Sequence, residues 1–257
     1  MSDGRSDYRK VAMDFLLYSY FGLSLDDLDG NCEKEIKYAA INKAYGDAAR
    51  HVLRLPELDS PDEKTFREIG TKWLMDNIGV EKDAATLINE FYENKEIKVI
   101  RDKCDEKNSE RKKNAESGKK EYGINQGHIQ KWVNMSYKYL CIIYTIKKEF
   151  IGGENHYEKF ADSDRYHIPV DRYILKESKF KENKEGYTWS TAKDYKKMED
   201  CVTDSQSFKE KGDKSKYEWE NDAWIRQSKA ERKANDKIRK RILELSLIHI
   251  SEPTRPY

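Results

Sequence analysis

The sequence lacks the cysteine pairs that bind zinc or iron-sulfur clusters. Its four cysteines are isolated from one another and form no Cys-x-x-Cys pair: Cys32, Cys104, Cys141 and Cys201. Reduced thiols of an intracellular protein are the ordinary interpretation of such cysteines. We therefore expect no metal site.

Long apolar runs are also missing. The N-terminal residues 1–7 have no apolar segment of the kind found in signal peptides, and no stretch approaches the roughly 18 apolar residues that cross a bilayer. The sequence therefore predicts a soluble, cytoplasmic protein with no membrane partner.

Neither sign of charge is in excess. The 49 Lys and Arg residues balance the 48 Asp and Glu residues, for a net charge of +1. A protein held on nucleic acid by bulk charge would be basic, so any basic surface must be local. Apolar residues make up 37% of the 257 residues, which is enough for one substantial core.

The end of the chain differs from what precedes it. Residues 245–257, Leu-Ser-Leu-Ile-His-Ile-Ser-Glu-Pro-Thr-Arg-Pro-Tyr, follow a charged helical run abruptly and look like the in-frame translation of a sequencing adapter. We therefore expect one helical domain over residues 1–244, which we predict to be a monomer, and a non-native tail over residues 245–257.

Helical periodicity dominates the rest of the chain. Apolar residues recur at helical spacing in residues 8–23, 33–55, 63–78 and 82–92, and no strand-like alternation stands out. The polar segment that follows predicts a basic loop or helix over about residues 105–122. The fold class is therefore predicted to be all-α, a compact helical bundle.

The most apolar helix is predicted over residues 127–147. One stripe along it should face the core, and Met135 and Ile142 lie on nearly the opposite side, so we expect this helix to be central. Lys131 and Lys138, seven residues apart, share that second face. Further on, Pro169 stops one segment and Asp171 opens the next helix. A long, highly charged helix is predicted over residues 216–244.

Several common catalytic motifs are absent. The sequence has no phosphate-binding loop, no Gly-x-Ser-x-Gly and no His-Glu-x-x-His. His128, His156 and His167 are too scattered to indicate a metal site. We expect no cofactor.

A short stretch nevertheless resembles the helix-hairpin-helix DNA glycosylases, especially those of the 8-oxoguanine type, including the archaeal branch. Gly123-Ile-Asn-Gln-Gly127-His-Ile-Gln-Lys131 is similar to the hairpin glycines followed by the lysine of that family, and Ile168-Pro-Val-Asp171 is similar to the segment that presents its aspartate. The resemblance covers about 50 of 257 residues. Neighbouring phrases, such as Gln130-Lys-Trp-Val-Asn134, also resemble uncharacterised bacterial and phage proteins, a setting that would fit phage defence.

The resemblance implies a base-excision glycosylase that acts on double-stranded DNA with a modified or damaged base. In an enzyme with β-lyase activity, Lys131 would attack the sugar C1′ to form a Schiff base, and Asp171 would accept the ammonium proton. In a monofunctional enzyme, Asp171 would act with water. Lys138, thirty-three residues before Asp171, fits the longer spacing of the archaeal branch, so the choice between the two lysines stays open.

Other residues are assigned to DNA by the same resemblance. The candidates for contacts with the DNA backbone are Gly123, Gly127, Lys112, Lys113, Lys119, Lys120 and Arg172. Trp132 and Trp189 are candidates for packing against an extruded base, although a place in the core would also explain each of them. The alternative is a non-enzymatic helical module that binds nucleic acid or protein, in which Lys131 and Lys138 are structural.

Overall fold

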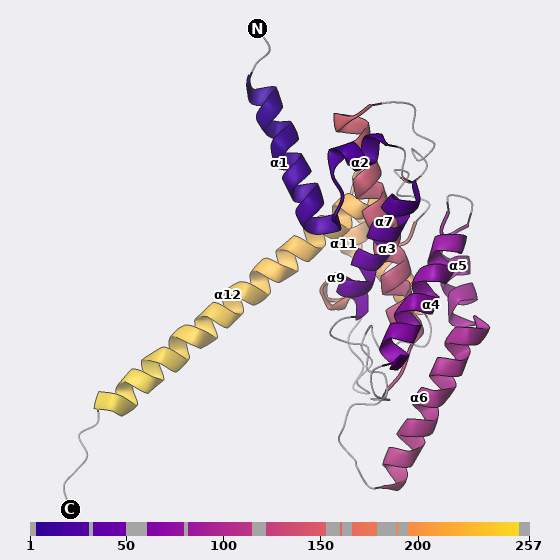
Figure 1. Ribbon diagram of the computed structural model, residues 1–257. Helices are drawn as coiled ribbons and strands as arrows, with labels where there is room; N and C mark the ends of the chain where they lie inside the picture. The colour runs from indigo at the N-terminus through magenta and orange to yellow at the C-terminus, as the bar shows by residue number, and fades with distance from the viewer. Residues whose placement is uncertain are drawn as a thin grey trace, which may run out of the picture.

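The computed structural model describes residues 4–30, 33–49, 61–79, 82–114, 122–152, 160, 166–178, 189 and 195–251. These residues form helices and no β-strand, which confirms the all-α class for the described part of the chain (Figure 1). The helices are α1 (Gly4–Phe21), α2 (Leu25–Asp29), α3 (Glu33–Ala49), α4 (Pro61–Asn77), α5 (Ala84–Tyr92), α6 (Lys95–Lys113), α7 (Gln126–Phe150), α9 (Arg172–Glu177), α10 (Tyr195–Thr203), α11 (Gln206–Lys209) and α12 (Lys216–Ser251).

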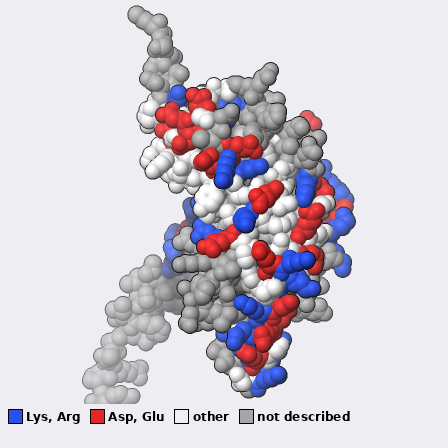
Figure 2. Space-filling model, turned by 45° about the vertical axis from the view of Figure 1, so that its right-hand side comes forward, with Lys and Arg blue, Asp and Glu red and all other residues white. Residues whose placement is uncertain are grey.

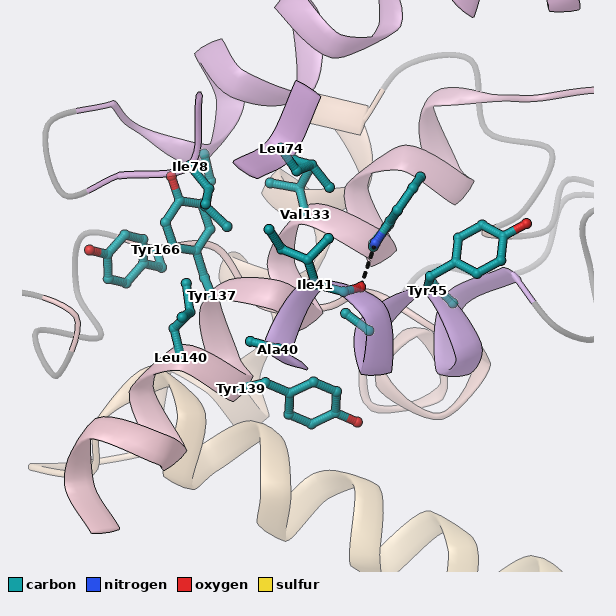
Figure 3. Packing of buried hydrophobic residues seen from close by; sticks show 14 of the residues in the cluster. Ala40, Ile41, Tyr45, Leu74, Ile78, Val133, Tyr137, Tyr139, Leu140 and Tyr166 are labelled. Atoms are coloured by element: carbon teal, nitrogen blue, oxygen red, sulfur yellow. Dashed lines mark hydrogen bonds between the residues drawn. The ribbon is translucent and has the colours of Figure 1, made fainter. Parts of the chain in front are cut away.

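The helix α7 is the centre of the bundle, as its apolar sequence predicted. It packs against α3 and α5, and it also contacts α2 and α10. The predicted inner stripe is fully buried, and its members are Ile129, Val133, Ser136, Leu140 and Ile143. Figure 3 shows Val133 and Leu140 of this stripe packed among Ile41, Leu74 and Tyr137.

Trp132 lies in the core beside this stripe. Its indole N–H donates a hydrogen bond to the backbone carbonyl of Ile41 at 2.9 Å, and its ring contacts Tyr45, Phe66 and Phe91. The ring also lies so close to Gly70 that a Cβ atom there would come within 2.4 Å of it. A side chain that is 2% exposed cannot stack on an extruded base. This placement corrects the stacking role predicted for Trp132.

Local sequence signals explain where several helices begin. Ser24 and Asp27 form a capping box at the start of α2, the short helix that periodicity did not predict. Asp83 caps α5 and Asn94 caps α6, each through a side-chain oxygen that accepts backbone N–H groups of the first turn. The polar segment predicted as a basic loop or helix is helical as far as Lys113.

Two helices extend away from the bundle. In Figure 1, α1 projects on one side, and α12 leaves the body and continues as a long arm. α12 packs against α9, with contacts at Trp224, Gln227 and Glu231. None of the helices in the described ranges is both long and apolar enough to cross a membrane.

Candidate active site

The site is built around a polar clamp between α7 and the segment that precedes α9. The Gln130 side chain is fully buried. Its Nε2–H donates to the carbonyl of Val170 at 2.7 Å, and its Oε1 accepts the N–H of Val170 at 3.1 Å. Gln130 therefore satisfies both backbone groups of a residue that has no helix or sheet partner there. The clamp fixes the neighbour of Val170, which is Asp171, opposite the neighbour of Gln130, which is Lys131.

One turn further along α7, Asn134 extends this polar contact. Its buried side-chain amide donates to the carbonyl of Ile168 at 3.3 Å, and it lies 3.3 Å from both Gln130 Oε1 and the Tyr195 hydroxyl. Tyr195 in turn hydrogen-bonds His167. The segment before α9 is thus held to α7 by buried hydrogen bonds, which are directional and specify one register.

Asp171 has two structural tasks in addition to any chemical one. It is the N-cap of α9, where its Oδ1 accepts the N–H groups of Tyr173 and Ile174 at 2.9 and 3.2 Å. Its other oxygen, Oδ2, lies 3.5 Å from Lys131 Nζ. The carboxylate is therefore oriented by the helix end on one side and faces the lysine with the other.

The Lys131–Asp171 pair is shielded from solvent. The two side chains are 14% and 12% exposed. The ammonium group also lies 4.8 Å from the centre of the Trp189 ring, a cation–π contact. The structure thus brings together Lys131, Asp171 and Trp189. The resemblance had paired Lys131 with Asp171 and had named Trp189, with Trp132, as a candidate for packing against a base.

Lys138 has a different partner. It forms an ion pair with Glu220 of α12, whose side chain is 4% exposed. Burial raises the pKa of the Glu220 carboxyl, and the adjacent Lys138 ammonium opposes that rise. Of the two candidate lysines, Lys131 is the one that pairs with Asp171, and Lys138 pairs with the buried carboxylate of Glu220.

Both ion pairs line one cavity of about 910 Å³, which lies within the usual size range of ligand sites. Its walls come from α1, α3, α7, α9 and α12 and are mostly aromatic or charged. The lining residues are Tyr20, Phe21, Asp47, Lys131, Met135, Lys138, Tyr139, Ile142, Pro169, Asp171, Arg172, Tyr173, Trp189, Glu220, Asn221 and Trp224. The second face predicted for α7, with Met135 and Ile142, is therefore the floor of this cavity.

The far wall of the cavity is a hydrogen-bonded tyrosine pair. The hydroxyls of Tyr20 and Tyr139 are 2.8 Å apart, and Tyr139 also donates to Asp47. Burial raises the pKa of both phenols, so they stay neutral and act as hydrogen-bond donors and acceptors. Sequence analysis missed this wall, because its members are far apart in the chain and belong to no motif.

The residues predicted to contact DNA are scattered relative to the cavity. Arg172 is on its wall and pairs with Glu231 at 2.9 Å. Lys112 and Lys113 are in the last turn of α6, which packs on α4 and α5, and neither lines the cavity. Lys119 and Lys120 lie outside the described residues.

The predicted hairpin glycines flank the start of α7. Gly123 lies just before the helix, and Gly127 is buried in its first turn. Residues 115–121, between the end of α6 and these glycines, lie outside the described part of the chain. Within the described residues, no group of three or more His, Cys, Asp or Glu side chains is arranged to hold a metal ion, and Cys104, Cys141 and Cys201 are free thiols.

His128 supports the site from behind Trp189. Its ring meets the Trp189 ring edge-on at 5.9 Å, and its Nδ1 accepts the backbone N–H of Asn125 at 3.2 Å. Burial lowers the pKa of His128 to about 4. The neutral ring must therefore carry its proton on Nε2.

This depressed pKa predicts a pH-dependent stability. Between about pH 6.5 and pH 4 the unfolded chain binds a proton at His128 that the folded protein does not, so the free energy of unfolding should fall as the pH falls. The variant His128→Asn keeps an acceptor for the backbone N–H of Asn125 but cannot bind the proton. Its free energy of unfolding should therefore fall less than that of the wild type over this pH range. Urea unfolding at pH 7.5 and 4.5 should show that the wild type loses about 2 to 3 kcal/mol more than the variant. Equal losses would show that His128 is not the titrating group.

Comparisons with known proteins do not assign the chain to a family. No family model, curated protein or solved structure matches the chain. The argument for function therefore depends on the cavity and its side chains.

Proposed function

We propose that this protein is a DNA glycosylase that excises a modified or damaged base and uses Lys131 as the nucleophile. The observation that carries the proposal is the Lys131–Asp171 pair, 3.5 Å apart and largely shielded from solvent, on the wall of a cavity large enough for a nucleoside. The resemblance of residues 123–175 to helix-hairpin-helix glycosylases supports the same assignment of roles.

The residues present account for each proton in the proposed reaction. Asp171 takes a proton from the Lys131 ammonium, and the neutral amine forms a bond with C1′ as the bond from C1′ to the base breaks. The base leaves with the electron pair and receives the proton from Asp171. A second proton from the lysine nitrogen passes to O4′ as the sugar ring opens, and the third stays on the nitrogen of the Schiff base.

The target nucleotide must leave the duplex for this reaction, because C1′ is out of reach inside the stack. The cavity offers a place for it. Trp189 lies next to Lys131 on the cavity wall, and the exposed Tyr20 offers its hydroxyl group for a hydrogen bond with a base. The pocket shape, together with these groups, would select the base.

Covalent trapping tests the proposal directly. The purified protein is incubated with a panel of duplexes that contain oxidised, alkylated or deaminated bases or an abasic site, in the presence of borohydride, which reduces a Schiff base to a stable amine. We expect a covalent adduct with at least one duplex, at Lys131 by peptide mapping. The yield should fall by about 100-fold or more in Lys131→Ala.

The second lysine of the cavity provides the matched control. Removing Lys138 alone would leave Glu220 buried and unpaired, which is costly, so the control replaces both partners, Lys138→Met with Glu220→Leu. This variant should still form the adduct. If neither an adduct nor a released base appears with any duplex of the panel, the proposal is wrong.

A binding module without catalysis is the second candidate. It is favoured by the fact that both lysines pair with shielded carboxylates on other segments, as structural ion pairs do. In that case Lys131→Ala would lower the free energy of unfolding, and every variant, like the wild type, would leave the modified base in place. Base release by the wild type decides between the two candidates.

A further inference from the structure

We infer that the outer part of α12, residues 229–241, is a duplex-binding arm that grips the phosphate backbone beside the cavity. The inference rests on the proposed function for its choice of DNA as the partner. Residues 229–241 were not among the predicted DNA contacts. The inference is drawn from the charge and the exposure of this part of α12.

The arm is exposed on every side. The last described contacts of α12 with α9 are made at Glu231, which pairs with Arg172 at 2.9 Å and with Lys176 at 3.7 Å. From Arg232 to Arg241 every residue is exposed, and Figure 1 shows the helix running outward from the body over this length. A helix that contributes nothing to the core is available to a partner.

The arm concentrates positive charge that the rest of the chain lacks. Residues 229–241 contain seven Lys and Arg and two Asp and Glu, a net charge of +5. Since the whole chain has a net charge of +1, the remaining residues together have a net charge of −4. A polyanion is therefore attracted to the arm and not to the molecule in general.

Four of the positive charges also lie on one face of the arm. Lys229, Lys233, Lys237 and Lys240 follow one another at intervals of four, four and three residues, which places them on one face of the helix. At about 1.5 Å per residue these lysines extend over roughly 17 Å. A single helix, about 10 to 12 Å in diameter with its side chains, also fits the major groove, which is about 12 Å wide.

Other occupants fit less well. In residues 229–241, Ile238 is the one large apolar side chain, so the arm has no apolar face for the membrane interface or for a coiled-coil seam. The helix α6 offers a weaker attraction, because its eight Lys and Arg are offset by five Asp and Glu, and one of its lysines, Lys107, pairs with Glu110. Figure 2 shows Lys and Arg interspersed with Asp and Glu on the face that carries α6.

The arm adjoins the proposed active site. Asn221 and Trp224, which precede it on α12, line the cavity, and Glu231 ties the arm to Arg172, also on the cavity wall. A duplex held at the beginning of the arm would therefore lie next to the cavity.

Binding of an undamaged, fluorescein-labelled 25-base-pair duplex tests the inference without any chemistry. The arm variant carries Lys→Gln at positions 229, 233, 237 and 240, and the matched control carries Lys→Gln at 95, 98, 103 and 107 on α6. Glutamine has nearly the helix propensity of lysine, and far-UV circular dichroism checks that the fold is kept. Both variants lose four charges, so bulk charge is equal.

We expect fluorescence anisotropy to show affinity about 100-fold weaker for the arm variant near 0.1 M NaCl, with the slope of log K against log[NaCl] reduced by about 3 to 4. The α6 control should stay within about threefold of the wild type. Equal losses in the two variants, unchanged binding by the arm variant, or a wild type that binds phosphatidylserine vesicles and not the duplex would each overturn the inference.

The two proposals fail in different ways. Salt-dependent duplex binding through the arm, without adduct or base release on any modified duplex, would reject the glycosylase and keep the arm. Covalent adduct formation that persists in the arm variant, together with unchanged binding of the undamaged duplex, would reject the arm and keep the glycosylase.

Discussion

Asp171→Asn should abolish most of the proposed glycosylase activity while it leaves the protein folded. Asparagine is as good an N-cap as aspartate, so the hydrogen bonds from Tyr173 and Ile174 to the side-chain oxygen should remain. An amide cannot accept the proton of the Lys131 ammonium or stabilise positive charge on the sugar. Single-turnover base release should therefore fall by roughly 100- to 10,000-fold, the usual range for loss of a general acid or base.

The cap role of Asp171 provides the control. Asp171→Ala removes the cap as well as the charge, so it should lower the free energy of unfolding by about 1 kcal/mol, whereas Asp171→Asn should change it little. Urea unfolding separates the two variants. If Asp171→Asn retained wild-type base release, Asp171 would be only a cap, and the proposed mechanism would lose its proton acceptor.

Gln130→Met should destabilise the folded protein strongly. Methionine fills similar space but leaves both the N–H and the carbonyl of Val170 buried without a partner. Each unsatisfied group costs about 1 to 3 kcal/mol, so the loss of both partners should lower the free energy of unfolding by about 2 to 6 kcal/mol. Urea unfolding measures the loss, and hydrogen exchange at Val170 locates it.

Gln130→Glu is the matched variant for the clamp. A carboxylate still accepts the N–H of Val170, but it donates to the Val170 carbonyl only when it is protonated. The variant should therefore be less stable than the wild type at pH 8 and should recover part of the loss as the pH is lowered. A Gln130→Met protein as stable as the wild type, with the Val170 amide equally protected, would show that the clamp does not hold this segment.

Periodicity predicted much of the helical framework. It placed α7 correctly as a central helix with an apolar stripe, because a helix that is buried on more than one face carries apolar residues on those faces. The start of α9 was predicted from Pro169 and Asp171 and not from periodicity, because helix capping depends on residues adjacent in the chain. Periodicity missed α2, whose five residues are too few to show a period and whose signal is the capping box at Ser24.

The candidate site was predictable only in part. The order of Gly127, Lys131 and Asp171 was visible in the chain, and the spacing of Lys131 and Lys138 placed them on one face of α7. The choice of partner was not visible, because two lysines on one helix face meet different elements. Lys131 meets the cap of α9, and Lys138 meets Glu220 of α12. Trp132 and Trp189 looked alike in sequence, and both are buried, yet only Trp189 of the two lines the cavity.

By itself, the sequence determined that this protein is helical, that α7 is central and that its second face carries Lys131 and Lys138. These properties depend on residues within a few turns of one another, where the helix repeat dictates geometry. Tertiary structure alone decided that Gln130 clamps Val170 forty residues away, that Asp171 thereby faces Lys131, and that the outer part of α12 leaves the core as a basic arm. Such contacts join distant segments, and they exist only once the core has packed.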